Sequence, residues 1–101
     1  MAEPNDLIHQ ALRLKIMAAL NAAQASGPLE FNRLKALVGA TDGNLSTHLS
    51  TLESAGYVKL DKDFVGKKPR TRATITKPGS AAFRAHVDYL REVIDGAAGP
   101  D

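Results

Sequence analysis

The chain has 101 residues, of which 44% are hydrophobic, 24% charged and 5% aromatic, and it contains neither Cys nor Trp. This length predicts a single domain spanning residues 1–101, too small for a deep substrate cavity, and the lack of Cys excludes disulfides, thiolate catalysis and Cys-based zinc sites. Because no apolar run has the length of a membrane span and the N-terminus lacks the basic start of a signal peptide, we expect a cytoplasmic protein with no membrane partner.

The net charge of +2 is unevenly distributed along the chain. Six basic and two acidic residues lie between Lys59 and Arg72, which gives this stretch a net charge of +4 and leaves −2 for the rest. One basic stretch in an otherwise slightly acidic protein is typical of an element that meets a polyanion, although a solvated lysine-rich hairpin would give the same pattern.

Two helices are predicted in the first forty residues. Apolar residues recur every three or four positions over residues 6–25, with Asp6 as a candidate cap, and a Ser-Gly-Pro sequence ends this helix. Residues 29–31 are too short for more than a brief extended link. A second helix over residues 31–38 ends at Gly39, because glycine is favoured just beyond a helix C-terminus.

A third helix is predicted over residues 42–55, directly after a tight turn. Thr41 or Asp42 can cap it, because each has a side-chain oxygen for the free backbone N–H groups. Its apolar residues recur at helical spacing and are expected to face the core: Leu45, Leu49 and Leu52.

A hairpin and a last helix complete the chain. Alternating apolar and polar residues on either side of Gly66 predict a β-hairpin over residues 57–76. The last helix, over residues 77–95, has Thr76 as its cap, and residues 96–101 are expected to form a disordered tail. The order helix, helix, tight turn, helix, hairpin, helix indicates a mainly α fold with a small β-hairpin (α+β), the winged helix-turn-helix.

The third helix has an unusual outer face. Opposite its leucines lie small polar residues rather than the Lys and Glu that favour surface helices. Small side chains let a helix lie close to base edges in a DNA major groove, and hydroxyls and amides both donate and accept hydrogen bonds. The candidate DNA-binding residues on this helix are Thr41, Asp42, Gly43, Asn44, Thr47, Ser50 and Thr51.

The predicted hairpin supplies the positive charge that the third helix lacks. Residues 41–55 include no Lys or Arg, so this helix cannot attract phosphates strongly by itself. Arg70 is the first candidate for a minor-groove contact, because its planar guanidinium suits a narrow, negative groove. The candidate DNA-binding residues of the hairpin are Lys67, Lys68, Arg70 and Arg72.

The residues from Leu45 to Val58 resemble the recognition-helix signature of winged-helix transcriptional regulators of the MarR and ArsR type. The pattern Thr41–Leu45 followed by Phe64–Thr71 is similar to short, stand-alone regulators related to MarR, and the match covers about Leu7–Ile94. This resemblance implies that the third helix reads the major groove, that the wing contacts backbone or minor groove, and that terminal helices form a homodimer.

The last helix has a wider apolar face than one small domain needs to cover. A two-fold partner would bury the excess together with part of the first helix, and two recognition helices would then contact DNA as a pair. The residues expected in this homodimer interface are Leu7, Ile8, Phe83, His86, Val87, Tyr89, Leu90, Val93 and Ile94.

No constellation for catalysis or for a metal is predicted. Ser46 and His48 project about 200° apart on a helix and cannot share a hydrogen bond. His9, His48 and His86 fall on three different predicted helices without the paired spacing of a metal site. We therefore expect a sequence-specific double-stranded DNA-binding regulator that is not an enzyme and has no cofactor. The alternatives are a protein-interaction module for an acidic partner, or a sensor regulator that responds to a metal or an unknown small-molecule effector.

Overall fold

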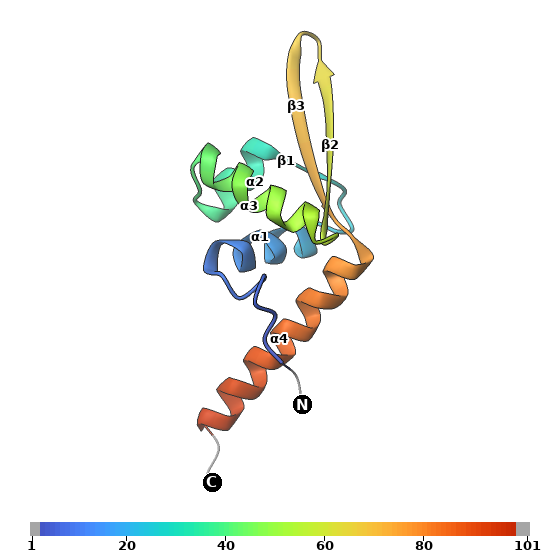
Figure 1. Cartoon of the computed structure of the whole chain (residues 1–101). Coiled ribbons are helices and arrows are strands. Elements are labelled where there is room, and N and C mark those ends of the chain that lie inside the picture. The colour runs from blue at the N-terminus through green and yellow to red at the C-terminus, as the bar shows by residue number, and fades with distance from the viewer. Residues whose placement is uncertain (1–2, 99–101) are drawn as a thin grey trace.

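The computed structural model describes residues 3–98, which form four helices and one three-stranded antiparallel sheet (Figure 1). The strand order is β1-β3-β2. This arrangement confirms the predicted winged helix-turn-helix, mainly α with a small sheet. The elements are α1 (Ala11–Ala22), β1 (Leu29–Glu30), α2 (Phe31–Val38), α3 (Asp42–Ser54), β2 (Val58–Val65), β3 (Lys68–Ile75) and α4 (Lys77–Ala98).

The hydrophobic core lies where the first three helices meet the base of the sheet. Helix α3 buries all three of the leucines that its apolar periodicity predicts, and α2 buries Leu34 and Val38, whereas Leu37 of the same apolar run is exposed. Above this base the β2–β3 hairpin extends away from the core as a wing (Figure 1). The core residues are Ile8, Ile16, Met17, Leu20, Leu34, Val38, Leu45, Leu49, Leu52, Val58, Ala73 and Ile75.

Helix α1 begins later than the predicted residue 6, and Asp6 does not cap it. Instead, Asn5 Oδ1 accepts a hydrogen bond from the Ile8 N–H at 3.0 Å, within a separate turn that places Ile8 in the core. The side chain of Gln10 then caps α1 by accepting the Arg13 N–H at 2.9 Å. Two side-chain acceptors in succession therefore divide the predicted helix into a turn and a shorter helix.

The link from α1 to α2 is also more structured than predicted. Helix α1 ends at Ala22 rather than at residue 25, because the chain then turns with two N–H groups donating to the Ala23 carbonyl. The extended segment that follows is strand β1, which pairs with β3 and places Leu29 opposite Ala73. The expected link is thus an edge strand of the sheet.

The connection between α2 and α3 is the predicted tight turn. Gly39 adopts φ 68°, a left-handed conformation in which glycine avoids the steric cost of a side chain, and its N–H closes α2 onto the Lys35 carbonyl. Thr41 then caps α3, its Oγ1 accepting the Asn44 N–H at 3.2 Å. This turn fixes the angle at which α3 leaves α2.

The wing is a β-hairpin whose two strands pair without interruption up to a two-residue turn. Val65 lies opposite Lys68 and Phe64 opposite Pro69, so the turn is formed by Gly66 and Lys67. Gly66 has φ 64°, and a positive φ at this first central position matches the tight turns whose twist fits a β-hairpin.

Helix α4 starts as predicted and continues further. Thr76 Oγ1 accepts the Gly79 N–H at 3.0 Å, which confirms its capping role. Gly96 keeps a helical backbone, and the helix runs to Ala98 rather than ending at residue 95. Of the expected tail, residues 99–101 lie outside the described part of the chain.

The start of α4 packs closely on the segment that precedes the wing. A Cβ built on Gly79 would lie 2.1 Å from the Tyr57 carbonyl oxygen, a distance that real Cβ atoms do not adopt. Beyond this contact α4 extends away from the body in the direction opposite to the wing, which gives the chain a long axis of 61 Å (Figure 1). No helix within residues 3–98 has the length and apolarity of a membrane span.

The N-terminal segment folds back onto α4 and changes the expected dimer face. The Asn5 N–H donates to His86 Nδ1 at 3.1 Å, and both His86 and Ile8 are fully buried within the chain. These two residues therefore offer no surface to a partner, contrary to the prediction. Val93 and Ile94 are exposed, and the rest of the predicted set is half-buried: Leu7, Phe83, Val87, Tyr89 and Leu90.

Candidate nucleic-acid interface

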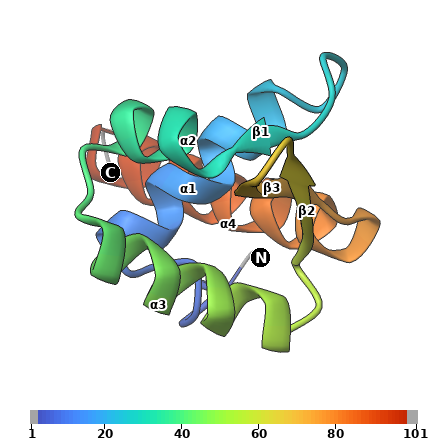
Figure 2. The same ribbon diagram turned by 90° about the horizontal axis from the view of Figure 1, so that it is seen from above.

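The outer face of α3 is uncovered along its length. In Figure 2 the helix lies along one edge of the molecule, with α1 on its inner side. The predicted contact residues Gly43, Asn44, Thr47 and Ser50 are all exposed. Within residues 3–98 the side chains of Asn44, Thr47 and Ser50 make no hydrogen bond. The amide and hydroxyl groups of this face are therefore available to an external partner.

The other predicted residues of α3 have partners inside the chain. Thr41 Oγ1 is occupied by its capping bond, and the half-buried Thr51 donates its hydroxyl to the Thr47 carbonyl at 3.1 Å. Asp42 Oδ1 lies 2.7 Å from Lys35 Nζ. This ion pair partly neutralises the one acidic side chain in the first turn of α3 and ties that turn to α2.

The four predicted basic residues of the wing form two groups, one without ion-pair partners in the described part of the chain and one that contacts Asp63. Lys67 and Lys68 are exposed at the turn and have no ion-pair partner within residues 3–98. Arg70 instead forms a bidentate pair with Asp63, with Nε–Oδ1 at 2.9 Å and Nη2–Oδ2 at 2.6 Å, and Arg72 Nη2 lies 3.6 Å from Asp63 Oδ2. The free positive charge of the wing is thus concentrated at its tip.

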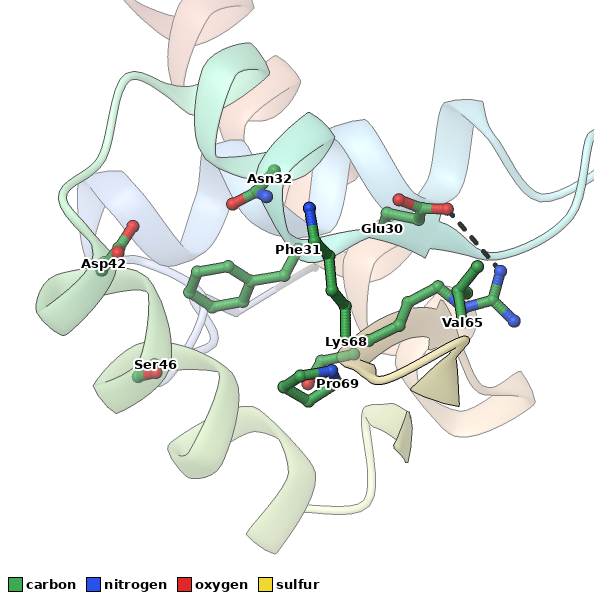
Figure 3. A pocket seen from close by; sticks show the side chains of 10 residues that line it. Glu30, Phe31, Asn32, Asp42, Ser46, Val65, Lys68 and Pro69 are labelled. Atoms are coloured by element: carbon green, nitrogen blue, oxygen red, sulfur yellow. Dashed lines mark ion pairs between the residues drawn. The ribbon is translucent and has the colours of Figure 1, made fainter. Parts of the chain in front are cut away.

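The Asp63 pair also affects the charge states of its members. The hydrogen bond from Arg70 lowers the pKa of Asp63 below its ordinary value, against an opposing effect of desolvation, and the nearby positive charges of Arg70 and Arg72 lower it further. The same hydrogen bond raises the pKa of Arg70. Arg70 Nη1 additionally lies 3.8 Å from Glu30 Oε1, which connects the wing to β1 (Figure 3). Arg70, the first candidate for a groove contact, is therefore held by two carboxylates.

A cleft of about 640 Å³ separates the wing from the helices (Figure 3). Its walls come from the end of β1, the start of α2, α3, the end of β2 and the outer half of β3, so it joins the uncovered helix face to the wing tip. Figure 3 shows Pro69 turned toward α3 and Lys68 extending toward α2. The lining residues are Glu30, Phe31, Asn32, Asp42, Ser46, Val65, Lys68, Pro69, Arg70 and Thr71.

The structure adds two residues to the predicted set. Ser46 of α3 borders both this cleft and a smaller one of about 160 Å³, which Lys62 of β2 also lines. Helical spacing places Ser46 between Gly43 and Ser50, and strand alternation places Lys62 on the face of Leu60. Both positions could therefore have been found from the sequence.

The three histidines are held by internal contacts. His48 Nδ1 lies 3.1 Å from Arg13 Nη1, a contact that ties α3 to α1. His9 Nδ1 and His86 Nε2 lie 3.4 Å apart, and the His86 ring stacks on Tyr89. Burial, together with the nearby charge of His9, lowers the pKa of His86. Residues 3–98 contain no group of three His, Asp or Glu side chains arranged to hold a metal ion.

Comparison with known proteins identifies the family. Residues 12–94 match the family model described as a winged helix DNA-binding domain. An uncharacterised protein of Methanocaldococcus jannaschii, MJ0432, is 34% identical over 88 residues, which cover 87% of this chain and 89% of that protein.

Solved structures agree with this assignment. A transcriptional regulator homologue from Pyrococcus horikoshii OT3 is 31% identical, with a TM-score of 0.80 over 90% of this chain and 87% of that one. A MarR-family regulator from Silicibacter pomeroyi shares the fold at 21% identity, with a TM-score of 0.71 over 90% of this chain and 58% of that one. The expectation of a DNA-binding domain agrees with the matched family model. The chain belongs to the winged helix DNA-binding domain family.

Proposed function

We propose that this protein is a sequence-selective regulator of transcription that binds double-stranded DNA. In this proposal α3 lies in the major groove, and the wing contacts the adjacent backbone and minor groove. The observation that carries the proposal is the cleft shared by Ser46 of α3 and Lys68 of the wing, because it places an uncovered hydrogen-bonding face and an unpaired positive charge around one concave surface.

The division of charge supports separate roles for the two elements. Helix α3 contains no Lys or Arg, so its exposed side chains are suited to reading base edges rather than to holding phosphates. The exposed Lys67 and Lys68 supply the phosphate attraction. The solved structures that share the fold include Staphylococcus aureus MepR in complex with DNA, at 20% identity.

The protein is proposed to act as a homodimer through α4. Val93 and Ile94 are 49% and 65% exposed on the part of the helix that extends from the body. Half-buried Leu90 and Phe83 continue the apolar surface toward the core. A second copy would bury this surface and present two α3 helices to DNA. The winged helix-turn-helix domain Mb0332 of Mycobacterium bovis, 18% identical, is a homodimer.

The direct test is retention on duplex DNA across a range of salt concentrations. The double variant Lys67→Ala/Lys68→Ala should bind more weakly, with the slope of log affinity against log salt shallower by about 1.8 if each lysine neutralises one phosphate. The matched control is Lys15→Ala/Lys77→Ala, which removes the same charge from exposed positions on α1 and α4. A wild-type protein that ignores duplex DNA at low salt would refute the proposal and favour an acidic protein partner.

Selection of bound duplexes from a random pool tests the mode of binding. A palindromic enriched sequence would support two α3 helices related by a two-fold axis. Enrichment of a motif without such symmetry would contradict the dimeric arrangement.

A further inference from the structure

The tip of the wing carries apolar surface beside its positive charge. Phe64 is 70% exposed, the highest value among the large hydrophobic residues of the described chain, and the adjoining Val65 is 56% exposed. A phenyl ring left in water forgoes the favourable free energy of burial. The tip of the wing, which the register puts next to Phe64, and the exposed part of α4 lie at opposite ends of the molecule (Figure 1). The proposed dimer face therefore does not account for it.

The register places Phe64 on the side of the wing that faces α3. Phe64 pairs with Pro69, and side chains alternate along a strand, so Phe64 shares its face with Lys62 and Leu60. Leu60 and Lys62 line the smaller cleft together with residues of α3. Pro69 is turned toward α3 in Figure 3. Val65 stands on the opposite face of the strand and lines the larger cleft.

The charge around Phe64 indicates what covers it. Lys62 on the same face, and Lys67 and Lys68 at the turn, are exposed and have no ion-pair partner within residues 3–98. Lys62 shares the face of Phe64, whereas Lys68, opposite Val65, lies on the other face, so positive charge flanks the apolar tip on both sides. Such a tip complements a polyanion that also offers apolar surface. The minor groove of DNA has this chemistry, because deoxyribose rings line its walls between the phosphates.

We propose that Phe64, supported by Pro69, is an apolar wedge that enters the minor groove beside the α3 site. This inference rests on the proposed function. Wedges of this type pack against sugars and partly separate a base step, at an energetic cost that is lowest at flexible pyrimidine–purine steps. Phe64 would then determine specificity at base pairs that α3 does not reach. The binding site should carry a TA or CA step beneath the wing.

The experiment uses a duplex selected from a random pool by the full-length wild-type chain. Hydroxyl-radical footprinting locates the deoxyriboses protected by the wing, and the base step beneath them is then changed from TA to AA. Phe64→Ala should weaken binding about tenfold and lose both the wing footprint and the preference for TA. Its salt slope should equal that of the wild type, because no charge is removed.

Further measurements separate this role from others. Phe64→Leu should retain most of the affinity, and Leu37→Ala, which removes exposed apolar surface from α2 outside both clefts, should bind as the wild type does. The proposal is overturned if Phe64→Ala keeps the footprint and the step preference, or if the ring instead mediates self-association or binding to vesicles containing phosphatidylserine. Failure of the wild type to select any duplex would instead refute the proposed function itself.

Discussion

Arg70 and Asp63 lie opposite each other across the wing and share two hydrogen bonds, of 2.9 and 2.6 Å. The same carboxylate also approaches Arg72. One acidic residue thus restrains two of the four basic residues that the sequence offers for DNA contact. The pair stiffens the middle of the wing and leaves the attraction of phosphates to the lysines at its tip.

Asp63→Asn should strengthen DNA binding and steepen its salt dependence. Without the carboxylate both arginines can turn to phosphates, which would add up to about 1.8 to the magnitude of the salt slope. The control is Asp61→Asn, which changes the charge equally on the same face of β2 but leaves the Arg70 pair intact. Equal slopes for the two variants would show that Asp63 does not restrain the arginines. Because the pKa of Asp63 is lowered, the wild-type pair should persist until the pH falls through that lowered value.

Asn44→Ala should reduce discrimination between DNA sequences rather than the general attraction to DNA. An amide that makes two hydrogen bonds to one base contributes about 1–3 kcal/mol to specificity. Binding to the selected duplex should therefore weaken, while binding to a random duplex and the salt slope stay unchanged. Ser54→Ala, at the exposed C-terminal end of the same helix, is the matched control. Competition between the two duplexes measures the ratio of their affinities. An unchanged ratio would show that Asn44 does not contact the bases.

Gly79→Ala should destabilise the fold by about 3 kcal/mol, because a methyl group would collide with the Tyr57 carbonyl oxygen. Gly96→Ala provides the control on the same helix. No neighbouring atom lies within 4 Å of a Cβ at Gly96, so alanine there should stabilise the helix by up to about 1 kcal/mol. Urea unfolding followed by circular dichroism measures both changes. Similar unfolding midpoints for the two variants would contradict the close approach at Gly79.

Ile94→Glu should convert the proposed homodimer into a monomer. A charge at the centre of an apolar interface leaves an unpaired, desolvated carboxylate when two copies meet. Leu37→Glu, at a 52% exposed position on α2, carries the same change on a different surface and should leave assembly unaltered. Sedimentation velocity distinguishes the species. A wild-type protein that remains monomeric at tens of micromolar would refute the dimer.

Lowering the pH below about 6.5 should weaken folding through His86. Its pKa is depressed in the folded chain, so the unfolded chain binds the proton more readily, and stability falls as the pH drops from the unfolded value toward the folded one. Protonation would also set an Nδ1–H against the Asn5 N–H, which now donates to that nitrogen. Thermal unfolding at pH 7.5 and 5.5 measures the change. The unfolding temperature of His86→Phe should change less with pH than that of the wild type, whereas His48→Gln should keep the wild-type pH dependence.

Much of the fold could be predicted because local signals agree with it. The leucines of α3 and the alternation around Gly66 indicate the right elements, and glycine beyond α2 marks its end. Counting outward from the turn at Gly66 and Lys67 also places Asp63 opposite Arg70, so that pair lay within reach of the sequence.

Contacts between distant segments could not be predicted in the same way. Strand β1 has only two residues and therefore shows no alternation, and it forms because β3 lies beside it. The burial of Ile8 and His86 depends on the N-terminal segment folding back onto α4. Periodicity showed that both residues lie on apolar faces, but it does not distinguish a face covered by the chain itself from one covered by a second copy.

Strand β1 reaches β3 only at Leu29 and Glu30, so the outer half of β3 presents an open edge. An unpaired strand edge is a template on which further strands can add, the first step toward amyloid-like aggregation. Pro69 interrupts this row of backbone donors because it has no N–H, and the charge of Lys68 beside it disfavours stacking of identical wings. The long wing can therefore stand free of the body without becoming a seed for fibres.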